Sequence, residues 1–116
     1  MRKIFYLSTC DTCKRILGQF DTSSFELQDI KKSHISADEL DILYRSEGSY
    51  EALFNKRAIK FRADGWNQKN LSDTDYKDLI LSEYTFLKRP AVIVEDKVFV
   101  GNSKKTVEAL LALLNE

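Results

Sequence analysis

Residues 3–17, KIFYLSTCDTCKRIL, hold the change of pattern that decides the fold. Residues 3–7 form a short, nearly continuous apolar run, which predicts a buried strand that ends in a polar turn. From Cys13 to Phe20, apolar side chains stand at i, i+3, i+4 and i+7, the spacing of one helix face. Asp11 or Thr12 can cap the start of this helix. The sequence therefore predicts a strand, a tight turn and a helix, with both cysteines of the chain at the junction.

Three further strand patterns follow this junction. Apolar and polar side chains alternate over residues 25–28, which predicts a second strand. A strand, a helix and a strand of this length form a right-handed βαβ unit with parallel strands. Residues 91–94 and 98–100 are β-branched runs separated by Glu95-Asp96-Lys97, which indicates a tight hairpin. Asn102 or Ser103 then caps a final helix. Its apolar face consists of Val107, Leu110, Leu111 and Leu114.

The middle of the chain has a helical pattern. Ser36 and Glu39 form a capping box that opens one helix, and Gly48 ends it. A short helical turn at residues 51–54 follows, and Ser72 caps another helix. These segments lie between the β-α-β part and the β-β-α part.

This order of elements predicts an α/β protein with a thioredoxin-like fold. Its four-stranded mixed sheet would carry a helical insertion between the two halves. We expect a single domain over residues 1–116, with a core of about residues 1–30 and 86–116 and the insertion at about residues 35–85, because no linker or repeat divides the chain.

The composition excludes several classes of protein. The chain has 116 residues, 18 Lys+Arg against 18 Asp+Glu, and 43% hydrophobic residues. It can therefore bury a core, and it offers no bulk attraction to nucleic acid or to an anionic membrane. The first apolar run is far shorter than a signal-peptide core or the roughly 20 residues of a membrane span. We expect a cytoplasmic protein with no direct nucleic-acid or membrane partner.

Cys10 and Cys13 form a C-x-x-C motif at the strand-to-helix turn. Exposed backbone amides and the positive end of the helix dipole favour a thiolate there, and Lys14 adds a cation. Cys10 lies before the helix and is the candidate nucleophile. Cys13 belongs to the apolar stripe, so it is either a small core residue or the thiol that resolves a mixed disulfide. A zinc site made of Cys10, Cys13 and His34 lacks a fourth ligand, and we predict no metal.

Pro90 is the only proline in the chain and stands directly before the strand at residues 91–94. In a thioredoxin-like fold a cis-proline takes this place and faces the cysteine turn. A trans-proline at a strand start is the alternative. Arg89 would point toward the same pocket, where an arginine can stabilise a thiolate or bind an oxyanion through two hydrogen bonds.

Other polar residues are weaker candidates. His34 lies in a polar loop, which is typical of a solvated residue. The basic segment of residues 56–62 is typical of a solvated face, although Arg57 or Arg62 could reach the Cys10 pocket. We interpret Trp66 as a core or packing residue.

Three segments together resemble the arsenate reductase (ArsC) and Spx family, and the likeness covers essentially the whole chain. They are residues 8–14 (STCDTCK), 51–57 (EALFNKR) and 88–94 (KRPAVIV), the last followed by a hairpin and Gly101. The resemblance implies a thioredoxin-like fold with a helical insertion, a nucleophile at Cys10 and the arginine before the proline at Arg89. The family's arsenate reductases attack arsenate with this cysteine and use glutathione and glutaredoxin to form arsenite. Its Spx branch carries a C-x-x-C thiol switch and binds the C-terminal domain of the RNA polymerase α subunit.

The chain departs from the arsenate reductase pattern around the nucleophile. Asp-Thr-Cys-Lys follows Cys10 where those enzymes have Gly-Thr-Ser-Arg, and Tyr6 stands where they have a histidine. Two arginines that hold the oxyanion in those enzymes are replaced near Asn55 and near Asn102. The added Asp11 and the smaller number of bidentate donors disfavour the binding of a doubly charged arsenate. Arg57 and the first motif resemble the corresponding residues of the Spx and YffB-like branches. We therefore place the chain closer to those branches than to the arsenate reductases.

The sequence thus predicts a thiol oxidoreductase, linked to glutathione or thioredoxin, that reduces a disulfide, a glutathione adduct or an oxyanion such as arsenate through the Cys10 thiolate. The alternative is an Spx-like, redox-sensing transcriptional regulator that binds the RNA polymerase α subunit. No bound cofactor is expected, and glutathione, glutaredoxin or thioredoxin are the predicted electron donors and partners. The predicted catalytic residues are Cys10, Cys13, Lys14 and Arg89, and the predicted substrate-binding residues are Thr12, Arg57 and Pro90.

Overall fold

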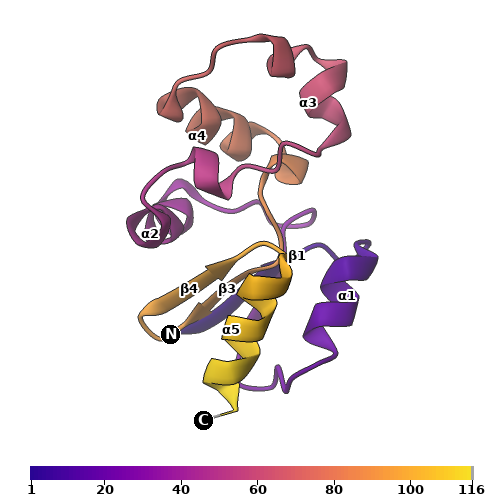
Figure 1. Ribbon diagram of the computed structural model, residues 1–116, viewed down its shortest axis with the longest axis vertical. Helices are drawn as coiled ribbons and strands as arrows, with labels where there is room; N and C mark the ends of the chain where they lie inside the picture. The colour runs from indigo at the N-terminus through magenta and orange to yellow at the C-terminus, as the bar shows by residue number, and fades with distance from the viewer. Residues whose placement is uncertain (116) are drawn as a thin grey trace. The chain divides into compact units, whose positions relative to one another are not determined.

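The computed structural model describes residues 1–115 and divides into two compact units. Met1–Ser33 and the chain from Arg89 onward form the first unit, and His34–Lys88 form the second. Figure 1 shows strands together with helices in the first unit, and helices joined by loops in the second. The second unit contains the predicted insertion of about residues 35–85. That residues 1–116 form a single domain stays a prediction.

The first unit is built on a four-stranded mixed sheet. Its strands are β1 (Arg2–Tyr6), β2 (Glu26–Asp29), β3 (Ala91–Val94) and β4 (Lys97–Val100), in the order β2-β1-β3-β4. β1 pairs in parallel with β2 and antiparallel with β3, and β3 pairs antiparallel with β4. The predicted mixed sheet is therefore confirmed. Because β1 and β2 are parallel and Tyr6 is in register with Asp29, both strands end at the same edge.

Two helices, α1 (Asp11–Leu17) and α5 (Lys104–Leu114), cover one face of this sheet (Figure 1). Ser103 caps α5, because its hydroxyl accepts a 3.2 Å hydrogen bond from the Thr106 N–H. The predicted cap of α1 is wrong: Cys10 is the capping residue, and its side chain makes no regular capping hydrogen bond. Strand and helix side chains share one core. Its buried members are Ile4, Phe25, Val92, Val94 and Leu110, with Leu17, Phe20, Leu113 and Leu114 among the partly buried ones.

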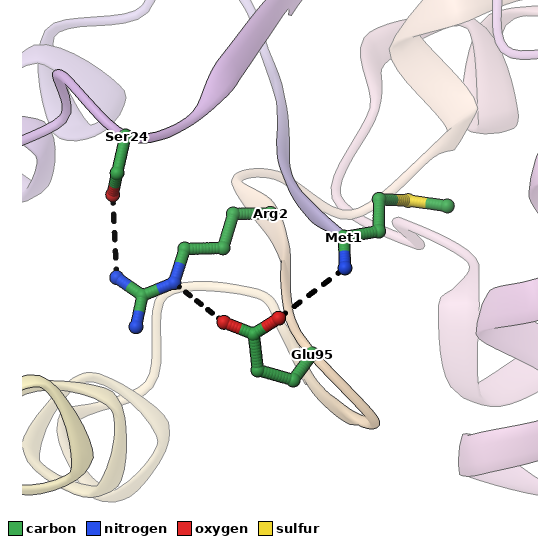
Figure 2. Close-up of polar contacts among 4 residues, drawn as sticks. All are labelled: Met1, Arg2, Ser24 and Glu95. Atoms are coloured by element: carbon green, nitrogen blue, oxygen red, sulfur yellow. Dashed lines mark hydrogen bonds and ion pairs between the residues drawn. The ribbon is translucent and has the colours of Figure 1, made fainter.

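The β3–β4 hairpin turns at the end of the sheet where β1 begins. Its turn is Glu95 and Asp96, one residue shorter than predicted because β4 starts directly after them. Glu95 has a φ of 57°, in the left-handed region that residues with a side chain rarely adopt. Figure 2 shows the contacts that hold it: the Glu95 carboxylate accepts from Arg2 Nε at 2.8 Å and pairs with the Met1 ammonium at 3.3 Å. Arg2 also donates to Ser24 Oγ at 3.2 Å, which ties this corner to the segment before β2.

The second unit consists of short helices joined by tight turns. Its capping box is confirmed, because Ser36 Oγ accepts from the Glu39 N–H at 3.1 Å and the Glu39 carboxylate accepts from the Ser36 N–H at 2.9 Å. Gly48 ends that helix with a φ of 84°, a conformation that favours glycine. Ser72 caps α4 (Asp73–Ser82), as predicted. The elements are α2 (Ala37–Glu47), α3 (Ile59–Ala63), α4 (Asp73–Ser82) and the 3-10 helices η1 (Glu51–Leu53), η2 (Trp66–Gln68) and η3 (Tyr84–Phe86).

Phe54 is the centre of the aromatic core of the second unit. Its ring lies 5.2 Å from that of Phe61 and 5.0 Å from each of the rings of Tyr76 and Phe86. Trp66 is only half-buried and carries Lys69 Nζ 4.5 Å from its ring centre, so it is a packing residue at the surface rather than a core residue. In the described part of either unit, residues 1–115, no helix is long and apolar enough to span a membrane.

Candidate active site

Cys10 ends a tight turn between β1 and α1. The Cys10 N–H donates to the Leu7 carbonyl at 3.0 Å, so residues 7–10 form a β-turn with Ser8 and Thr9 at its corner. Cys10 keeps an extended backbone, with φ −92° and ψ 113°, and the chain becomes helical directly after it. Its side chain is half-buried. The structure therefore places a partly accessible sulfur where the strand gives way to the helix.

The surroundings of Cys10 favour its charged form. Burial is the largest single influence on its pKa and opposes ionisation, but four other influences act in the opposite direction. Cys13 contributes through its backbone N–H and its thiol, and Arg89 contributes through a side-chain hydrogen bond and its positive charge. Together they hold the pKa of Cys10 below the ordinary thiol value of 9.0. More of this thiol is therefore the nucleophilic thiolate near neutral pH.

Cys13 is the opposite kind of thiol. Its side chain is fully buried, and this burial is the main reason that its pKa rises to about 11. The Leu7 backbone opposes the rise through a hydrogen bond, and the charge of Cys10 adds to it. Cys13 is therefore a protonated core residue that can donate to the Cys10 sulfur. Both cysteines are free, and a resolving role for Cys13 stays a prediction.

Arg89 and Pro90 reach this site from the start of β3. The peptide bond between them is cis, which confirms the predicted conformation over the trans alternative. Pro90 is buried, and its carbonyl accepts a 3.0 Å hydrogen bond from the Gly101 N–H, which fixes it beside the end of β4. Because Ala91 is in register with Phe5, the residues before β3 lie at the edge where β1 ends. The structure thus brings together Cys10, Cys13 and Arg89.

The remaining predicted site residues keep untested roles. Thr12 is half-buried in the first turn of α1, and Lys14 is exposed on the same helix. Arg57 belongs to the second unit, where it is exposed and its N–H donates to Asn55 Oδ1 at 3.1 Å. The roles of Thr12, Lys14 and Arg57 stay predictions. His34 is exposed, with its ring 6.1 Å from that of Tyr84.

Asn55 has a structural task inside the second unit. Its N–H donates to the Phe86 carbonyl at 2.7 Å, and its Nδ2 donates to the Thr85 carbonyl at 3.2 Å. These bonds hold η1 to η3, so the asparagine near one of the replaced arginines ties two turns together. Asn102 is exposed in the loop between β4 and α5.

Within residues 1–115 no group of three or more His, Cys, Asp or Glu side chains is placed to hold a metal ion.

Sequence reasoning missed two polar residues beside the cysteine turn. Ser8 Oγ donates to Asp29 Oδ2 at 2.6 Å, a bond between the turn after β1 and the last residue of β2. Twenty-one positions separate them, so no local pattern reveals the pair. The available signal was that both polar residues stand at the ends of strands expected to pair in parallel.

The mixed sheet, the helix after β1, the C-x-x-C turn with Arg89 beside it and the cis Arg89–Pro90 bond define a thioredoxin-like α/β protein with a thiol site. A family model, the ArsC family, matches residues 5–110. The chain therefore belongs to the ArsC family, as the resemblance of its motifs indicated.

Three known proteins are similar to this chain over most of their length. The global transcriptional regulator Spx of Streptococcus pyogenes is 25% identical over 97% of this chain and 86% of its own. A solved protein named YFFB is 21% identical and superposes with a TM-score of 0.82 over 98% of this chain and 99% of its own, which supports the fold. A possible arsenate reductase from Streptococcus mutans is 25% identical, with a TM-score of 0.75 over 95% of this chain and 97% of its own.

Proposed function

We propose that this protein is a cytoplasmic thiol oxidoreductase in which Cys10 is the nucleophile. The observation that carries the proposal is the Arg89 side chain beside a half-buried Cys10 whose pKa is lowered. An arginine in this place stabilises the thiolate before attack and a negatively charged leaving group or oxyanion afterwards. Cys13 supports the same state of Cys10, because its protonated thiol donates toward the thiolate.

The first step is attack on an oxidised sulfur. With a disulfide or a glutathione adduct as substrate, the Cys10 thiolate forms a new S–S bond to one sulfur, while the old S–S bond breaks and the other sulfur leaves as a thiolate. A second thiolate then attacks the mixed disulfide and releases the substrate in its reduced form. The two electrons come from an external thiol system, either glutathione with glutaredoxin or thioredoxin.

Cys13 can supply the second thiolate once the first step has occurred. The negative charge of Cys10 is one of the causes that raise the pKa of Cys13, after burial. Formation of the mixed disulfide removes that charge, so the pKa of Cys13 falls and its attack on Cys10 becomes easier. The product would be a Cys10–Cys13 disulfide that the external thiol system reduces. Glutathione attacking the Cys10 sulfur directly is the alternative route.

An oxyanion such as arsenate is the second class of substrate. The Cys10 thiolate would form an S–As bond with loss of water, and Arg89 would bind the oxyanion oxygens. Disulfides are favoured over arsenate, because Asp11 follows the nucleophile and asparagines stand near the replaced arginines. The similarity to a possible arsenate reductase from Streptococcus mutans is the reason to include arsenate in the test.

Coupled NADPH consumption tests this proposal. The wild-type protein and Cys10→Ser are offered a model mixed disulfide, a protein disulfide and arsenate, with glutathione and glutaredoxin or with thioredoxin as donor. We expect turnover of the disulfides by the wild type and none by Cys10→Ser. Cys13→Ser separates the routes, since it should retain turnover only if glutathione resolves the intermediate. No turnover of any substrate with either donor would contradict the proposal.

A second candidate function is redox-sensing regulation through RNA polymerase. Its support is the likeness to the Spx regulator over 97% of the chain, together with the C-x-x-C pair and Arg57. Capture of the purified polymerase α subunit by the reduced and by the peroxide-treated protein tests it, with mass spectrometry of the Cys10–Cys13 peptide to record the redox state. Binding in one state only would support this function. Absence of binding in the reduced state and in the oxidised state would exclude it.

A further inference from the structure

Asp29 is the centre of a compact set of hydrogen bonds at the edge of the sheet where β1 and β2 end. Its Oδ2 accepts from Ser8 Oγ at 2.6 Å, and its Oδ1 accepts from the Lys31 N–H at 3.2 Å. Its carbonyl accepts from the N–H groups of Lys32 at 3.0 Å and Ser33 at 2.9 Å. One residue therefore fixes both the segment after β2 and the turn after β1.

The turn that Asp29 holds is in contact with both thiols. Ser8 is at the corner of this turn, whose ends are Leu7 and Cys10. The Leu7 carbonyl accepts from the Cys10 N–H at 3.0 Å, and the Leu7 backbone also hydrogen-bonds to the Cys13 thiol. A shift of the turn would therefore move Cys10 relative to Cys13. It would also move Cys10 relative to Arg89, which reaches the site from another strand.

We infer that Asp29 is a positioning residue for the thiol site: through Ser8 it fixes the turn that keeps the Cys10 sulfur beside Arg89 and Cys13. This inference rests on the proposed function, because it assigns Asp29 a task in preparing the Cys10 nucleophile. It concerns the state of the free protein and needs no substrate.

Asp29 suits this task because its carboxylate stays ionised. The Ser8 hydroxyl is the main cause that lowers its pKa below 3.8; burial opposes the shift, and the backbone N–H groups of Lys31 and Ser8 add to it. The carboxylate therefore remains an acceptor at neutral pH. The Ser8 hydroxyl and the backbone amides of Lys31 and Ser8 are the donors that hold this carboxylate, and with it the turn.

Charge and position predict opposite effects when Asp29 is removed. A negative charge at this edge disfavours a second negative charge on Cys10, so loss of the charge alone would lower the pKa of Cys10 or leave it unchanged. Loss of the positioning contact moves Cys10 away from Arg89 and Cys13, which would raise its pKa. The sign of the change therefore separates a positioning role from a purely electrostatic one.

The experiment is the pH dependence of Cys10 alkylation by iodoacetamide, measured on the Cys10 peptide by mass spectrometry. Asp29→Ala and Ser8→Ala should each raise the apparent pKa of Cys10 and slow alkylation at pH 7 by roughly three- to tenfold, because the rate follows the thiolate fraction. The double variant should react no more slowly than either single one, since both changes break one contact. Asp29→Asn keeps an acceptor for the hydroxyl of Ser8 and should restore most of the rate.

Asp21→Ala is the matched control. Asp21 also accepts a hydrogen bond at a turn, from the Ser23 N–H at 2.9 Å, but it lies in the loop that leads to the start of β2. This substitution should leave the alkylation profile unchanged. Urea unfolding of each variant shows that it is folded, and Ser8→Ala carries the same expectation if Asp29→Ala does not fold.

Two results would overturn the inference. A pKa of Cys10 that is unchanged or lower in both Asp29→Ala and Ser8→Ala would show that the contact does not position the thiol, while the proposed nucleophile would stand. An ordinary pKa of Cys10 in the wild type would overturn both the positioning role and the proposed function. A raised pKa in Asp29→Ala and Ser8→Ala, restored by Asp29→Asn, supports the inference.

Discussion

Carboxylates secure both ends of the sheet in the first unit, but their donors differ. At the hairpin end, Glu95 is held by charged groups, the Arg2 guanidinium at 2.8 Å and the Met1 ammonium at 3.3 Å. At the cysteine end, Asp29 is held by the Ser8 hydroxyl at 2.6 Å and by backbone amides. The hairpin end is thus held by charged donors and the cysteine end chiefly by neutral ones, while Arg89 favours the Cys10 thiolate through a hydrogen bond and its charge.

The same difference sets the response of each end to its surroundings. Exposed ion pairs weaken as salt rises, whereas hydrogen bonds from neutral donors depend little on ionic strength. The hairpin end should therefore respond to salt and acid, and the cysteine end to substitutions that change the position or charge of its thiols.

Arg89→Gln should have the largest effect at the cysteine end. Loss of the guanidinium removes one hydrogen bond and the positive charge that favour the Cys10 thiolate. We expect the apparent pKa of Cys10 to rise and its alkylation at pH 7 to slow by about tenfold. Arg15→Gln, an exposed arginine on α1, is the control and should react like the wild type. If Arg89→Gln had the wild-type alkylation profile, the assignment of this arginine to the thiol would fail.

Cys13 should make the cysteine end sensitive to alkali. Burial raises the pKa of its thiol from 9.0 in the unfolded chain to about 11 in the folded one. The stability that this provides is complete below pH 9 and is lost as the pH rises toward 11, because the unfolded thiol ionises first. In a Cys10→Ser background, we expect the free energy of unfolding to fall by about 1 kcal/mol more from pH 8 to pH 10 when Cys13 is present than when it is replaced. Urea unfolding of Cys10→Ser with and without Cys13→Ala measures this, and equal pH profiles would contradict it.

Glu95→Gln should have the smallest effect and the opposite pH dependence. The Arg2 side chain and the N-terminal ammonium lower the pKa of Glu95 below 4.5, so its contribution is present above pH 4.5 and is lost as the pH falls through the folded value. We expect a small drop in stability at neutral pH that high salt removes, with no change in Cys10 alkylation. Thermal unfolding at low and high salt measures it. A change in Cys10 reactivity would show that the two ends are not independent.

Local patterns in the sequence predicted most elements of both units. Each of these elements is marked by a pattern only a few residues long. Examples are the apolar run of β1, the Ser36 capping box and the β-branched runs of β3 and β4. α3, η2 and η3 were not predicted. α3 spans only five residues, begins without a side-chain cap and exposes Ile59 at 86%, so neither a cap signal nor an apolar stripe marks it.

The candidate site was only partly predictable, because it joins residues from three places in the chain. The C-x-x-C spacing and the single proline pointed to Cys10, Cys13 and Pro90. The Asp29–Ser8 bond depends on strand register, which sequence patterns specify weakly for two polar residues at strand ends. Burial raises the pKa of Cys13, whereas contacts with Cys13 and Arg89 outweigh burial at Cys10, and both effects follow from tertiary packing rather than from a local pattern.

The most direct test of the account is the apparent pKa of Cys10 in the wild-type protein. Iodoacetamide alkylation from pH 5 to 10, followed on the Cys10 peptide by mass spectrometry, gives this value separately from that of Cys13. We predict a pKa below 9.0 for Cys10, with Cys13 unreactive over the same range. A pKa of Cys10 at or above 9.0 would contradict the central claim that this site prepares a thiolate.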